Sequence, residues 1–446
     1  MTALTVPAEL ASACARVTPA SPADTVAARP ARFLAAPATT AEAAAVLRAA
    51  ASLGLTVVPR GAGSRLDWGP PPASCDLIVD TGRLDQLLEH AAGDLVVSVQ
   101  AGVRLDDLAK VLATAGQRLA LDPPRGTGDG VTGPGGGTIG GLIATGAAGP
   151  LRYRYGSPRD LLIGITVIRP DGTVAKAGGK VVKNVAGYDI GKLFAGSFGT
   201  LGLITAATFR LHPLPAQTMR VGVECPGPAA AAEAATIIAD SPLAPSAIEL
   251  DWPAAADSIS VSALLEGDEV SVAVRADRLA QLLERAMPGQ SPDLTKRSAD
   301  RPAHPALAAA SGRGGPGTGT LIRVAFWAGQ LAPVLTAIRA AAARHGLDPA
   351  ISGSAGAGVL EVGVGATAAA EAVAGFVTDL RAGLARCTTS SVLPGTSSAV
   401  VLHAPPAVRD AVDMWGPVQS LELMRAVKDQ FDPERRMAPG RLPGGI

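Results

Sequence analysis

The sequence is poor in aromatic residues and cysteine, and neither sign of charge is in excess. Aromatic residues make up 3% of the 446 residues, so a core must rest on Val, Leu, Ile and Ala within an apolar fraction of 48%. The four cysteines form no Cys-x-x-Cys pair, which argues against a disulfide framework and an iron–sulfur ligand set. Basic and acidic residues number 39 each, which argues against a general nucleic-acid surface.

No segment has the pattern of a secretory signal or of a membrane span. The first 20 residues lack a basic region followed by an apolar run. No apolar run reaches the ~18 residues that a membrane helix needs. The length of 446 residues and the charged fraction of 17% predict two or three domains with sizeable cores. We expect a cytoplasmic protein with reduced cysteines.

Glycine, in contrast, is abundant, and it is concentrated between Pro123 and Arg169. The densest run is Gly133-Pro-Gly-Gly-Gly-Thr-Ile-Gly-Gly141. Glycine costs roughly 0.5–1 kcal/mol relative to alanine inside a regular element, so this run predicts a loop whose backbone approaches a flat or charged ligand. The run also matches the dinucleotide pattern Gly-x-Gly-x-x-Gly. Loop-type residues rather than a buried strand precede it, which disfavours a nicotinamide-binding unit.

A second glycine-rich turn follows a short apolar segment, residues 55–59, that is predicted to be a buried strand. The turn reads Arg60-Gly-Ala-Gly-Ser64, and the backbone N–H groups of such a turn can converge on phosphate oxygens. Arg60 would add positive charge and Ser64 a hydroxyl donor. An ordinary tight turn accounts for these residues equally well, and no Gly-Lys-Ser/Thr follows that would make it a Walker loop.

Hydrophobic periodicity predicts alternating strands and helices in both halves of the chain. In the first half, we expect helices over 40–52 (capped by Thr40) and 105–115, strands over 76–80, 95–100, 161–169 and 203–211, and a hairpin turn at 170–172. In the second half, we expect strands over 248–250, 258–265, 269–275, 321–327, 359–364 and 399–403, helices over 229–240, 276–286, 331–345, 367–385 and 421–432, and a long loop over 288–319. The second half therefore predicts an antiparallel sheet with helices on one face.

Five motifs, taken in order, resemble those of a known family. They are Arg60–Ser64, Thr138–Gly141, Arg154–Gly156, Lys183–Asp189 and Gly196–Gly202. Over about residues 30–215 the chain resembles the FAD-linked oxidases of the vanillyl-alcohol oxidase type, and its tail resembles the closing segment of that family. The resemblance implies an α+β fold with four parts: an arm (1–30), a PCMH-type FAD-binding domain of two subdomains (31–215), an α+β cap (216–403) and a C-terminal segment that returns to the FAD domain (404–446).

The resemblance also implies where FAD would bind. Covalent members carry His where Ser64 stands, so we expect non-covalent FAD. A Gly63→Val substitution should abolish FAD retention, because a branched side chain would fill the phosphate cradle. The implied cofactor-binding residues are Arg60, Gly61, Ala62, Gly63 and Ser64 at the pyrophosphate, Thr138, Ile139, Gly140, Gly141, Ala144 and Thr145 along the flavin, and Gly202 and Ile204 near the adenine.

Within the family, the short cap and the segment Leu423–Lys428 look most like the FAD-binding (GlcE-like) subunit of glycolate oxidase. This likeness implies a larger FAD-linked subunit and an iron–sulfur subunit as partners, and a small 2-hydroxy acid as substrate. Any membrane attachment would arise through those partners. Two other hypotheses stay open: a self-sufficient flavin oxidase, and a non-catalytic assembly subunit with a vestigial flavin site.

The catalytic residues are less well indicated. Relatives that oxidise 2-hydroxy acids carry a His-rich metal motif, which this chain lacks, so we expect no metal site and assign no catalytic base. Arg441 is a candidate clamp for a substrate carboxylate, because a guanidinium matches a carboxylate bidentately. Tyr155 and Tyr188 are candidate polar contacts to the substrate. An exposed tail position for Arg441 and plain packing for the tyrosines account for these residues at least as well.

Overall fold

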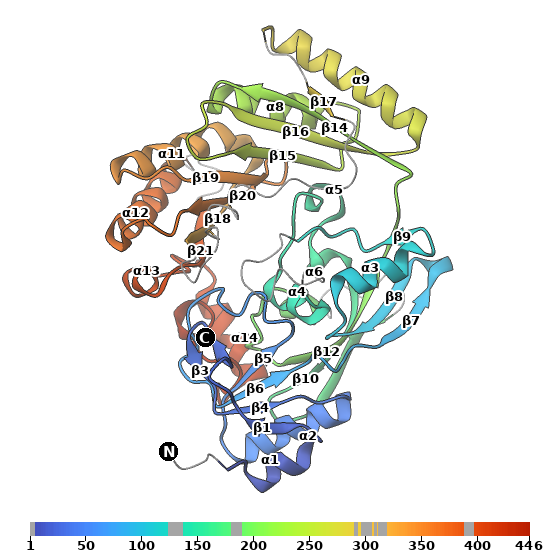
Figure 1. Cartoon of the computed structure of the whole chain (residues 1–446), viewed down its shortest axis with the longest axis vertical. Coiled ribbons are helices and arrows are strands. Elements are labelled where there is room, and N and C mark those ends of the chain that lie inside the picture. The colour runs from blue at the N-terminus through green and yellow to red at the C-terminus, as the bar shows by residue number, and fades with distance from the viewer. Residues whose placement is uncertain are drawn as a thin grey trace. The chain divides into compact units, whose positions relative to one another are not determined.

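The computed structural model describes residues 5–123, 137–179, 190–289, 293–295, 306, 310, 319–387 and 397–446. The chain divides into two units, which are taken one at a time (Figure 1). Unit 1 comprises Met1–Ala147, Ser157–Leu214 and Pro417–Ile446, and unit 2 comprises Ala148–Gly156 and Pro215–Gly416. The C-terminal segment therefore belongs to the same unit as the N-terminal residues.

A four-stranded sheet forms the first layer of unit 1. Its order is β1 (Val17–Pro19), β4 (Phe33–Ala35), β6 (Leu77–Asp80) and β5 (Val57–Arg60). Strands β4, β6 and β5 run parallel, and β1 pairs antiparallel with β4. The two-stranded ribbon of β2 (Thr25–Val26) and β3 (Arg29–Pro30) precedes β4. Because β5 and β6 are apolar and buried, the residues that follow β5 start from a fixed position.

Helix α2 (Thr40–Ser52) connects β4 with β5, and α1 (Ala8–Ala13) packs beside it. The buried residues of α2 recur three or four positions apart, as the predicted helical periodicity requires. The N-cap is Thr39, whose Oγ1 accepts a hydrogen bond from the Glu42 N–H at 3.1 Å. The predicted cap, Thr40, is wrong by one residue, because both threonines suit the position and only the backbone decides between them.

The second layer of unit 1 is an antiparallel sheet of five strands. Its order is β11 (Val174–Gly178), β10 (Leu162–Ile168), β12 (Leu203–Arg210), β8 (Val96–Gln100) and β7 (Leu87–Ala91). The predicted hairpin at 170–172 joins β10 and β11, with Ile168 opposite Val174. Edge strand β7 was not predicted, because its first three residues are exposed and lack an apolar alternation.

Short elements complete unit 1 around this sheet. The helices are α3 (Leu105–Ala113), α4 (Ile139–Thr145), α6 (Pro158–Leu161) and α7 (Gly191–Phe194), with the 3-10 turns η1 (Ala92–Asp94) and η3 (Pro443–Gly445), and β9 (Gln117–Arg118) pairs with β13 (His212–Pro213). Helix α4 was not predicted, since its sequence Ile-Gly-Gly-Leu-Ile-Ala-Thr continues the glycine-rich run. The start of that run, residues 133–136, lies outside the described residues.

The C-terminal segment adds to both layers of unit 1. Helix α14 (Leu421–Phe431) sets Phe431 edge-on against Phe194, with ring centroids 5.6 Å apart. Beyond it, Met437 forms a parallel bridge with Val57 of β5. The Val57 N–H donates to the Arg436 carbonyl at 2.8 Å, so this segment lies alongside the strand that leads into the Arg60–Ser64 turn.

Unit 2 is built on one antiparallel sheet. Its order is β17 (Asp293–Thr295), β14 (Gln217–Cys225), β16 (Ile259–Gly267), β15 (Ala247–Trp252), β19 (Ala350–Ser354), β20 (Val359–Val364), β18 (Thr320–Ala325) and β21 (Ser398–His403). Helices α8 (Pro228–Asp240), α9 (Glu269–Ala286), α11 (Leu331–Arg344) and α12 (Ala370–Cys387) cover one face (Figure 1), and α5 (Arg152–Tyr155), α13 (Pro406–Ala411) and η2 (Ala328–Gln330) are shorter. This arrangement confirms the predicted α+β cap with helices on one face.

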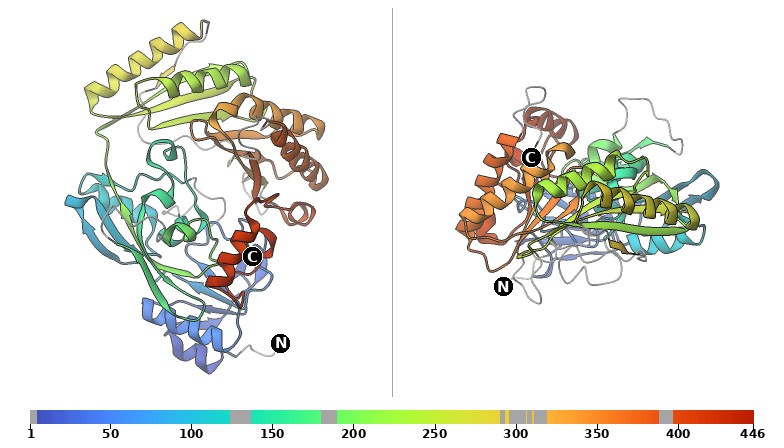
Figure 2. Two further views of the ribbon diagram at one scale, coloured as in Figure 1. Left: turned by 180° about the vertical axis from the view of Figure 1, so that it is seen from behind. Right: turned by 90° about the horizontal axis from the view of Figure 1, so that it is seen from above.

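The two faces of this sheet differ in chemistry. One face joins the four long helices in a single core of Val, Ile, Leu and Ala. The other carries the ion pairs Arg220–Glu249 (2.5 Å) and Arg323–Glu361 (3.3 Å), whose carboxylates are almost fully buried. The alternation along the strands thus sends apolar residues toward the helices and charged residues away from them. Figure 2 shows the same sheet and helices from behind and from above.

Two predictions for unit 2 are wrong or incomplete. Residues 269–275 were predicted to form a strand because Val270, Val272 and Val274 alternate, but they form the first half of α9. Within that helix Val272 is buried, whereas Val270 is 73% exposed, so the true period is helical. Strand β19 was not predicted, because its small residues Ala-Ile-Ser-Gly-Ser are all buried and show no alternation. Most of the predicted loop 288–319 lies outside the described residues.

Within the part of the chain that the structure describes, no helix combines the length and the apolar character needed to cross a bilayer.

Candidate functional site

A pocket in unit 1 opens where β5 ends. The strand leads into the turn 61–64, in which Gly63 has a left-handed backbone (φ 76°) that glycine adopts without steric cost. Residues of helix α4, of the turn at 198–199 and of the C-terminal segment surround this turn. The lining residues are Val58, Pro59, Gly61, Ala62, Gly63, Ser64, Arg65, Leu66, Thr138, Gly141, Ala144, Thr145, Phe198, Gly199 and Arg441.

Gly61 is the point at which two of the predicted motifs meet. A Cβ atom on Gly61 would lie 2.1 Å from Oγ1 of Thr138, a distance that no real side chain tolerates. Thr138 is the N-cap of α4, and its Oγ1 accepts a hydrogen bond from the Gly141 N–H at 3.3 Å. Glycine is therefore required at residue 61, because the turn passes directly over the start of the helix.

Gly63 has a backbone conformation that favours glycine. A Cβ atom there would meet only Leu66 Cδ1, at 3.9 Å, so the adjoining space is open. The positive φ makes a branched residue unfavourable at residue 63, and the predicted filling of a phosphate cradle stays a prediction.

Ile139 and Gly140 do not line the pocket, although both were predicted to contact the flavin. Ile139 is fully buried in the core of unit 1. The Gly140 N–H donates to the Ala101 carbonyl at 2.7 Å, and a Cβ on Gly140 would lie 3.0 Å from Ala101 Cβ. These two residues pack α4 against the loop after β8, while Gly141, Ala144 and Thr145 on the helix line the pocket.

The turn 196–202 contributes pocket residues that the predicted set did not include. Phe198 and Gly199 line the pocket, and both have positive φ angles, 52° and 76°. The Phe198 N–H donates to the Ala144 carbonyl at 2.8 Å, which ties the turn to α4. A Cβ on Gly199 would lie 3.0 Å from Pro59 Cδ, so the turn also packs against β5. The sequence signal for this turn was the pair of glycines in Gly-Ser-Phe-Gly, because glycine is the residue that most readily adopts a positive φ.

Gly202 and Ile204, predicted near the adenine, are not among the lining residues. A Cβ on Gly202 would lie 2.6 Å from the Ile168 carbonyl oxygen, so glycine there allows β12 to approach β10. Ile204 is buried in the core of unit 1.

Arg60 was predicted to bring positive charge to the pyrophosphate, but its side chain turns elsewhere. Its guanidinium donates to Asp24 at 2.6 Å and to Asp80 at 2.8 and 3.0 Å. Burial alone would raise the pKa of Asp24, but the hydrogen bonds from Arg60 and Ser21 outweigh it and hold that pKa below its usual value. Two carboxylates thus hold the Arg60 charge, and Arg60 is not among the lining residues.

The arginine that does line the pocket is Arg65, which was not among the predicted site residues. Its side chain is 6% exposed, and its guanidinium carbon lies 5.3 Å from the ring centre of Trp68. A Cβ on Gly137 would lie 3.2 Å from Arg65 Nη1, so the guanidinium lies against the backbone that leads into α4. The signal for it was present: an arginine directly after the Gly-Ala-Gly-Ser turn.

Arg441 also lies in the pocket wall, and it is buried rather than an exposed tail residue. It is 3% exposed, and Nη1 and Nη2 donate to the carbonyls of Leu66 and Trp68, each at 2.8 Å. These bonds hold the loop that follows the Gly61–Ser64 turn. The structure therefore places Arg441 where it supports the wall, and its predicted function as a carboxylate clamp stays a prediction.

The two candidate tyrosines have different outcomes. Tyr155 lies in unit 2, and its hydroxyl donates to Glu266 Oε2 at 2.8 Å. Tyr188 lies outside the described residues. Among the described residues, no group of three His, Cys, Asp or Glu side chains is placed to hold a metal ion.

Comparison with known proteins agrees with this pocket. Residues 31–178 match the family model described as FAD binding domain, and residues 412–442 match the C-terminal domain of FAD linked oxidases. The chain therefore carries a FAD-binding domain, and its C-terminal segment is similar to that of the FAD-linked oxidases. FAD is its cofactor, and all of the pocket lining at 58–66 and 138–145 falls within the first matched segment.

Individual relatives match this chain over part of their length. The glycolate oxidase subunit GlcD of Bacillus subtilis (strain 168) is 34% identical over 180 residues, which cover 40% of this chain and 37% of the relative. The glycolate oxidase subunit GlcE of Escherichia coli (strain K12) is 34% identical over 159 residues, which cover 36% of this chain and 43% of the relative. These matches thus span about two fifths of the relatives' length.

A solved structure extends the similarity of the fold to both units. The structure of p-cresol methylhydroxylase with substrate bound superposes with a TM-score of 0.71, covering 97% of this chain and 95% of that one. At 16% identity, this likeness shows a shared PCMH-type fold.

The pocket of the FAD-binding domain fits the chemistry of FAD. The turn 61–64 consists of two glycines, an alanine and a serine, so that a diphosphate can approach its backbone closely. Arg65 adds a buried cation beside that turn. Small residues at Gly141, Ala144 and Thr145 leave the face of α4 open to a flat ring system.

Proposed function

We propose that this chain is the FAD-binding subunit of a complex that oxidises a small 2-hydroxy acid, such as glycolate to glyoxylate. The electrons would pass onward to partner subunits. The observation that carries this proposal is the pocket whose segments 58–66 and 138–145 lie within the matched FAD binding domain, in a chain that is 34% identical to subunits GlcD and GlcE over part of its length. The proposal keeps the predicted division into a FAD-binding domain (31–215), a cap (216–403) and a returning C-terminal segment (404–446).

The pyrophosphate of FAD would bind at the turn after β5. The backbone N–H groups of Gly61–Ser64 and the Ser64 hydroxyl supply the donors. Arg65 supplies the positive charge in place of Arg60, whose guanidinium is held by Asp24 and Asp80. Because this charge is buried, its attraction to phosphate is screened less than that of a surface arginine. Ser64 makes no covalent link in this proposal, so FAD would be released on unfolding.

The flavin end would lie along α4 and the turn at 198–199. FAD, when bound, supplies the hydride acceptor for oxidation of the hydroxy acid. Gly141 and Ala144 keep side chains out of the way of the ring, and the Thr145 hydroxyl is committed to the Gly141 carbonyl at 2.7 Å. The tie from Phe198 N–H to the Ala144 carbonyl fixes the distance between the two walls.

The remaining parts of the reaction are proposed to come from partners. Oxidation of a 2-hydroxy acid also needs a base for the hydroxyl proton and a cation for the carboxylate. We assign no base to this chain and propose that a larger FAD-linked subunit provides it, with an iron–sulfur subunit as electron acceptor. The self-sufficient oxidase remains the alternative that activity of the isolated chain would favour.

The experiment that tests this function begins with the visible absorption spectrum of the purified chain, before and after heat denaturation. We expect the absorption of oxidised flavin, and its release into the supernatant on heating. Colour that stays with the precipitate would mean a covalent link. A colourless chain that takes up no added FAD would contradict the proposal. If the chain alone oxidised glycolate with an artificial acceptor, the proposal of a subunit would give way to that of a complete oxidase.

A further inference from the structure

Helix α14 contains a lysine that is fully buried and is not part of the pocket lining. Lys428 and Asp432 both have side chains with 0% exposure, one helical turn apart, and their charged groups are 2.6 Å apart. A charge leaves water at a cost of several kcal/mol, so a buried lysine needs partners for each of its N–H groups. Burial lowers the pKa of this ammonium group, while Asp432 acts in the opposite direction.

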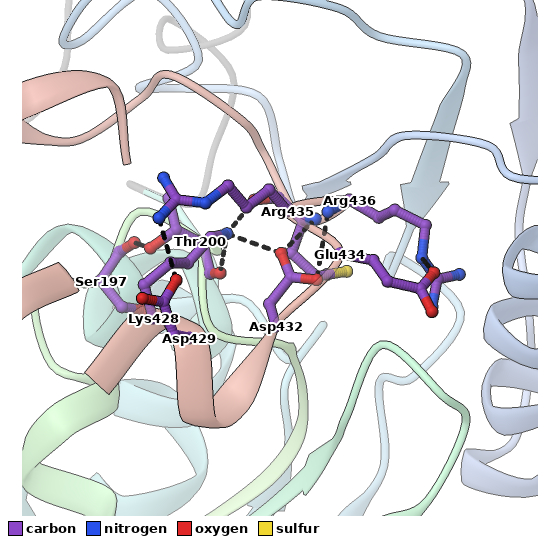
Figure 3. A network of polar contacts seen from close by, with 9 residues as sticks. Ser197, Thr200, Lys428, Asp429, Asp432, Glu434, Arg435 and Arg436 are labelled. Atoms are coloured by element: carbon purple, nitrogen blue, oxygen red, sulfur yellow. Dashed lines mark hydrogen bonds and ion pairs between the residues drawn. The ribbon is translucent and has the colours of Figure 1, made fainter. Parts of the chain in front are cut away.

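The partners of Lys428 account for all three of its donors. Nζ donates to Asp432 Oδ2 at 2.6 Å, to the Thr200 carbonyl at 2.7 Å and to the Met437 carbonyl at 2.9 Å. An ammonium group has three N–H donors, so the set is complete. Figure 3 shows the Lys428 and Asp432 side chains directed toward each other, with Thr200 beside them.

The Asp432 carboxylate also accepts hydrogen bonds from two backbone N–H groups. Its Oδ1 accepts the Arg436 N–H at 3.1 Å, and its Oδ2 accepts the Met437 N–H at 2.7 Å. The carboxylate thus shapes the chain after α14, and the ammonium joins that chain to the turn at Thr200. A fully satisfied buried network of this kind permits one arrangement of its parts.

Both backbone carbonyls that Lys428 binds belong to segments of the pocket wall. Thr200 follows Phe198 and Gly199, the two lining residues with positive φ. Met437 bridges Val57 of β5 and leads to Arg441, which holds the carbonyls of Leu66 and Trp68. One ammonium group therefore connects the flavin-side turn with the segment that supports the phosphate-side loop.

We propose that Lys428 is a positioning residue of the FAD site, which holds the 198–199 turn and the 436–441 segment in the arrangement that accepts the cofactor. This inference rests on the proposed placement of FAD in the pocket. It assigns Lys428 no contact with the cofactor. Positive φ at a non-glycine residue is strained, so the 198–199 turn relaxes when the Thr200 carbonyl loses its donor.

Two double variants separate positioning from stability. K428M/D432L replaces the pair with apolar side chains of similar size, so that no charge is left buried alone. It also takes their side-chain partners from the carbonyls of Thr200 and Met437 and from the N–H groups of Arg436 and Met437. K428Q/D432N removes the charges but keeps an amide donor for the carbonyls. R435M is the matched control, since it removes a cation of the same segment that lies exposed beside Asp429 at 2.9 Å.

The measurements are FAD titration of each full-length apoprotein and thermal unfolding of the same sample. We expect K428M/D432L to unfold at a lower temperature than the natural chain, because buried backbone groups lose their partners. Its Kd for FAD, measured well below that temperature, should rise about tenfold or more. K428Q/D432N should recover most of the affinity, and R435M should match the natural chain. The spectrum of bound flavin should shift in K428M/D432L only.

Several outcomes would overturn the inference. An unchanged Kd in K428M/D432L would make the pair structural alone. An equal rise of the Kd in R435M would show that the effect does not belong to the buried pair. If K428M/D432L does not fold, the decision passes to K428Q/D432N: a protein that folds as stably as R435M but has lost its affinity for FAD would contradict a donor role. Failure of the natural chain itself to bind FAD would remove the proposed function instead, and this inference with it.

Discussion

Two of the ion-pair clusters in the described part of unit 1, the Arg60 cluster and the Lys428–Asp432 pair, differ in burial. At the tip of β5, Arg60 pairs with Asp24 and Asp80, whose side chains keep 12% and 24% of their surface exposed. In the C-terminal segment, Lys428 and Asp432 are fully buried. A partly exposed pair can exchange its partner for water, whereas a fully buried charge cannot. Burial therefore decides how much each cluster contributes to holding the pocket.

The largest expected effect is the loss of one partner from the buried pair. Lys428→Met leaves the Asp432 carboxylate buried without its cation, which should lower the free energy of unfolding by about 3–5 kcal/mol. Arg60→Met leaves two carboxylates that retain some contact with solvent and should cost less, about 1–3 kcal/mol. Urea denaturation of the two apoproteins, followed by circular dichroism, measures both changes. Equal losses would show that burial is not what separates the clusters.

The next effect tests the turn that follows the Arg60 cluster, where Gly61 contacts Thr138. Gly61→Ala places a methyl group 2.1 Å from Thr138 Oγ1, so the turn must move away from α4. We expect the affinity for FAD to fall about tenfold or more, a free-energy loss of ~1.4 kcal/mol or above. FAD content after gel filtration and a titration of the apoprotein check this.

Gly93→Ala serves as the control for that substitution, because no atom lies within 4 Å of its Cβ position and its φ is not positive. It should bind FAD as the natural chain does. A Gly61→Ala protein with full FAD content would mean that the approach of the turn to Thr138 is not needed for the cofactor.

A third effect distinguishes the two arginines around the turn. Arg65→Gln should weaken FAD binding roughly tenfold and reduce its dependence on salt, because the buried cation beside the phosphate turn is lost. Arg60→Gln should leave the Kd and its salt dependence unchanged while lowering stability slightly. Titrations at low and high ionic strength read both quantities. If Arg60→Gln removed the salt dependence instead, the assignment of the two arginines would have to be exchanged.

The sequence predicted the parts of this site that depend on local backbone chemistry. The turn at 60–64 and the small residues of Thr138–Thr145 were found because clustered glycines are costly in a regular element and indicate a close approach of the backbone. The structure brings the two motifs together at Gly61 and Thr138. The direction of a side chain carries no such local signal. Arg60 and Arg65 are both arginines at the edges of one turn, and only the carboxylates of Asp24 and Asp80, distant in sequence, decide which one faces the pocket.

The C-terminal cluster could not be predicted for a similar reason. The apolar residues of α14 recur at helical spacing, at Leu421, Met424, Val427 and Phe431. The only fully buried side chain of that helix is nevertheless Lys428. Its partners at Thr200 and Met437 are backbone carbonyls, which every residue type offers equally. Residues 269–275 show the opposite error, in which a sequence pattern was present but predicted the wrong element. Their apolar residues alternate as in a strand, yet they belong to helix α9.

The smallest expected effect is the contribution of Asp24, in the Arg60 cluster, to the pH dependence of stability. The pKa of Asp24 is below its usual value of 3.8: burial raises it, but the hydrogen bonds from Arg60 and Ser21 lower it by more. A carboxyl with a lower pKa in the folded state stabilises the fold above its unfolded pKa, and that stabilisation is lost as the pH falls through the folded pKa. The natural chain should therefore be more stable than Asp24→Asn at pH 7, by about 1 kcal/mol or less. The two should converge as the pH falls below 3.8. Urea midpoints measured between neutral and strongly acidic pH give the two curves, and curves that stay parallel throughout would show that the Asp24–Arg60 pair does not couple to folding.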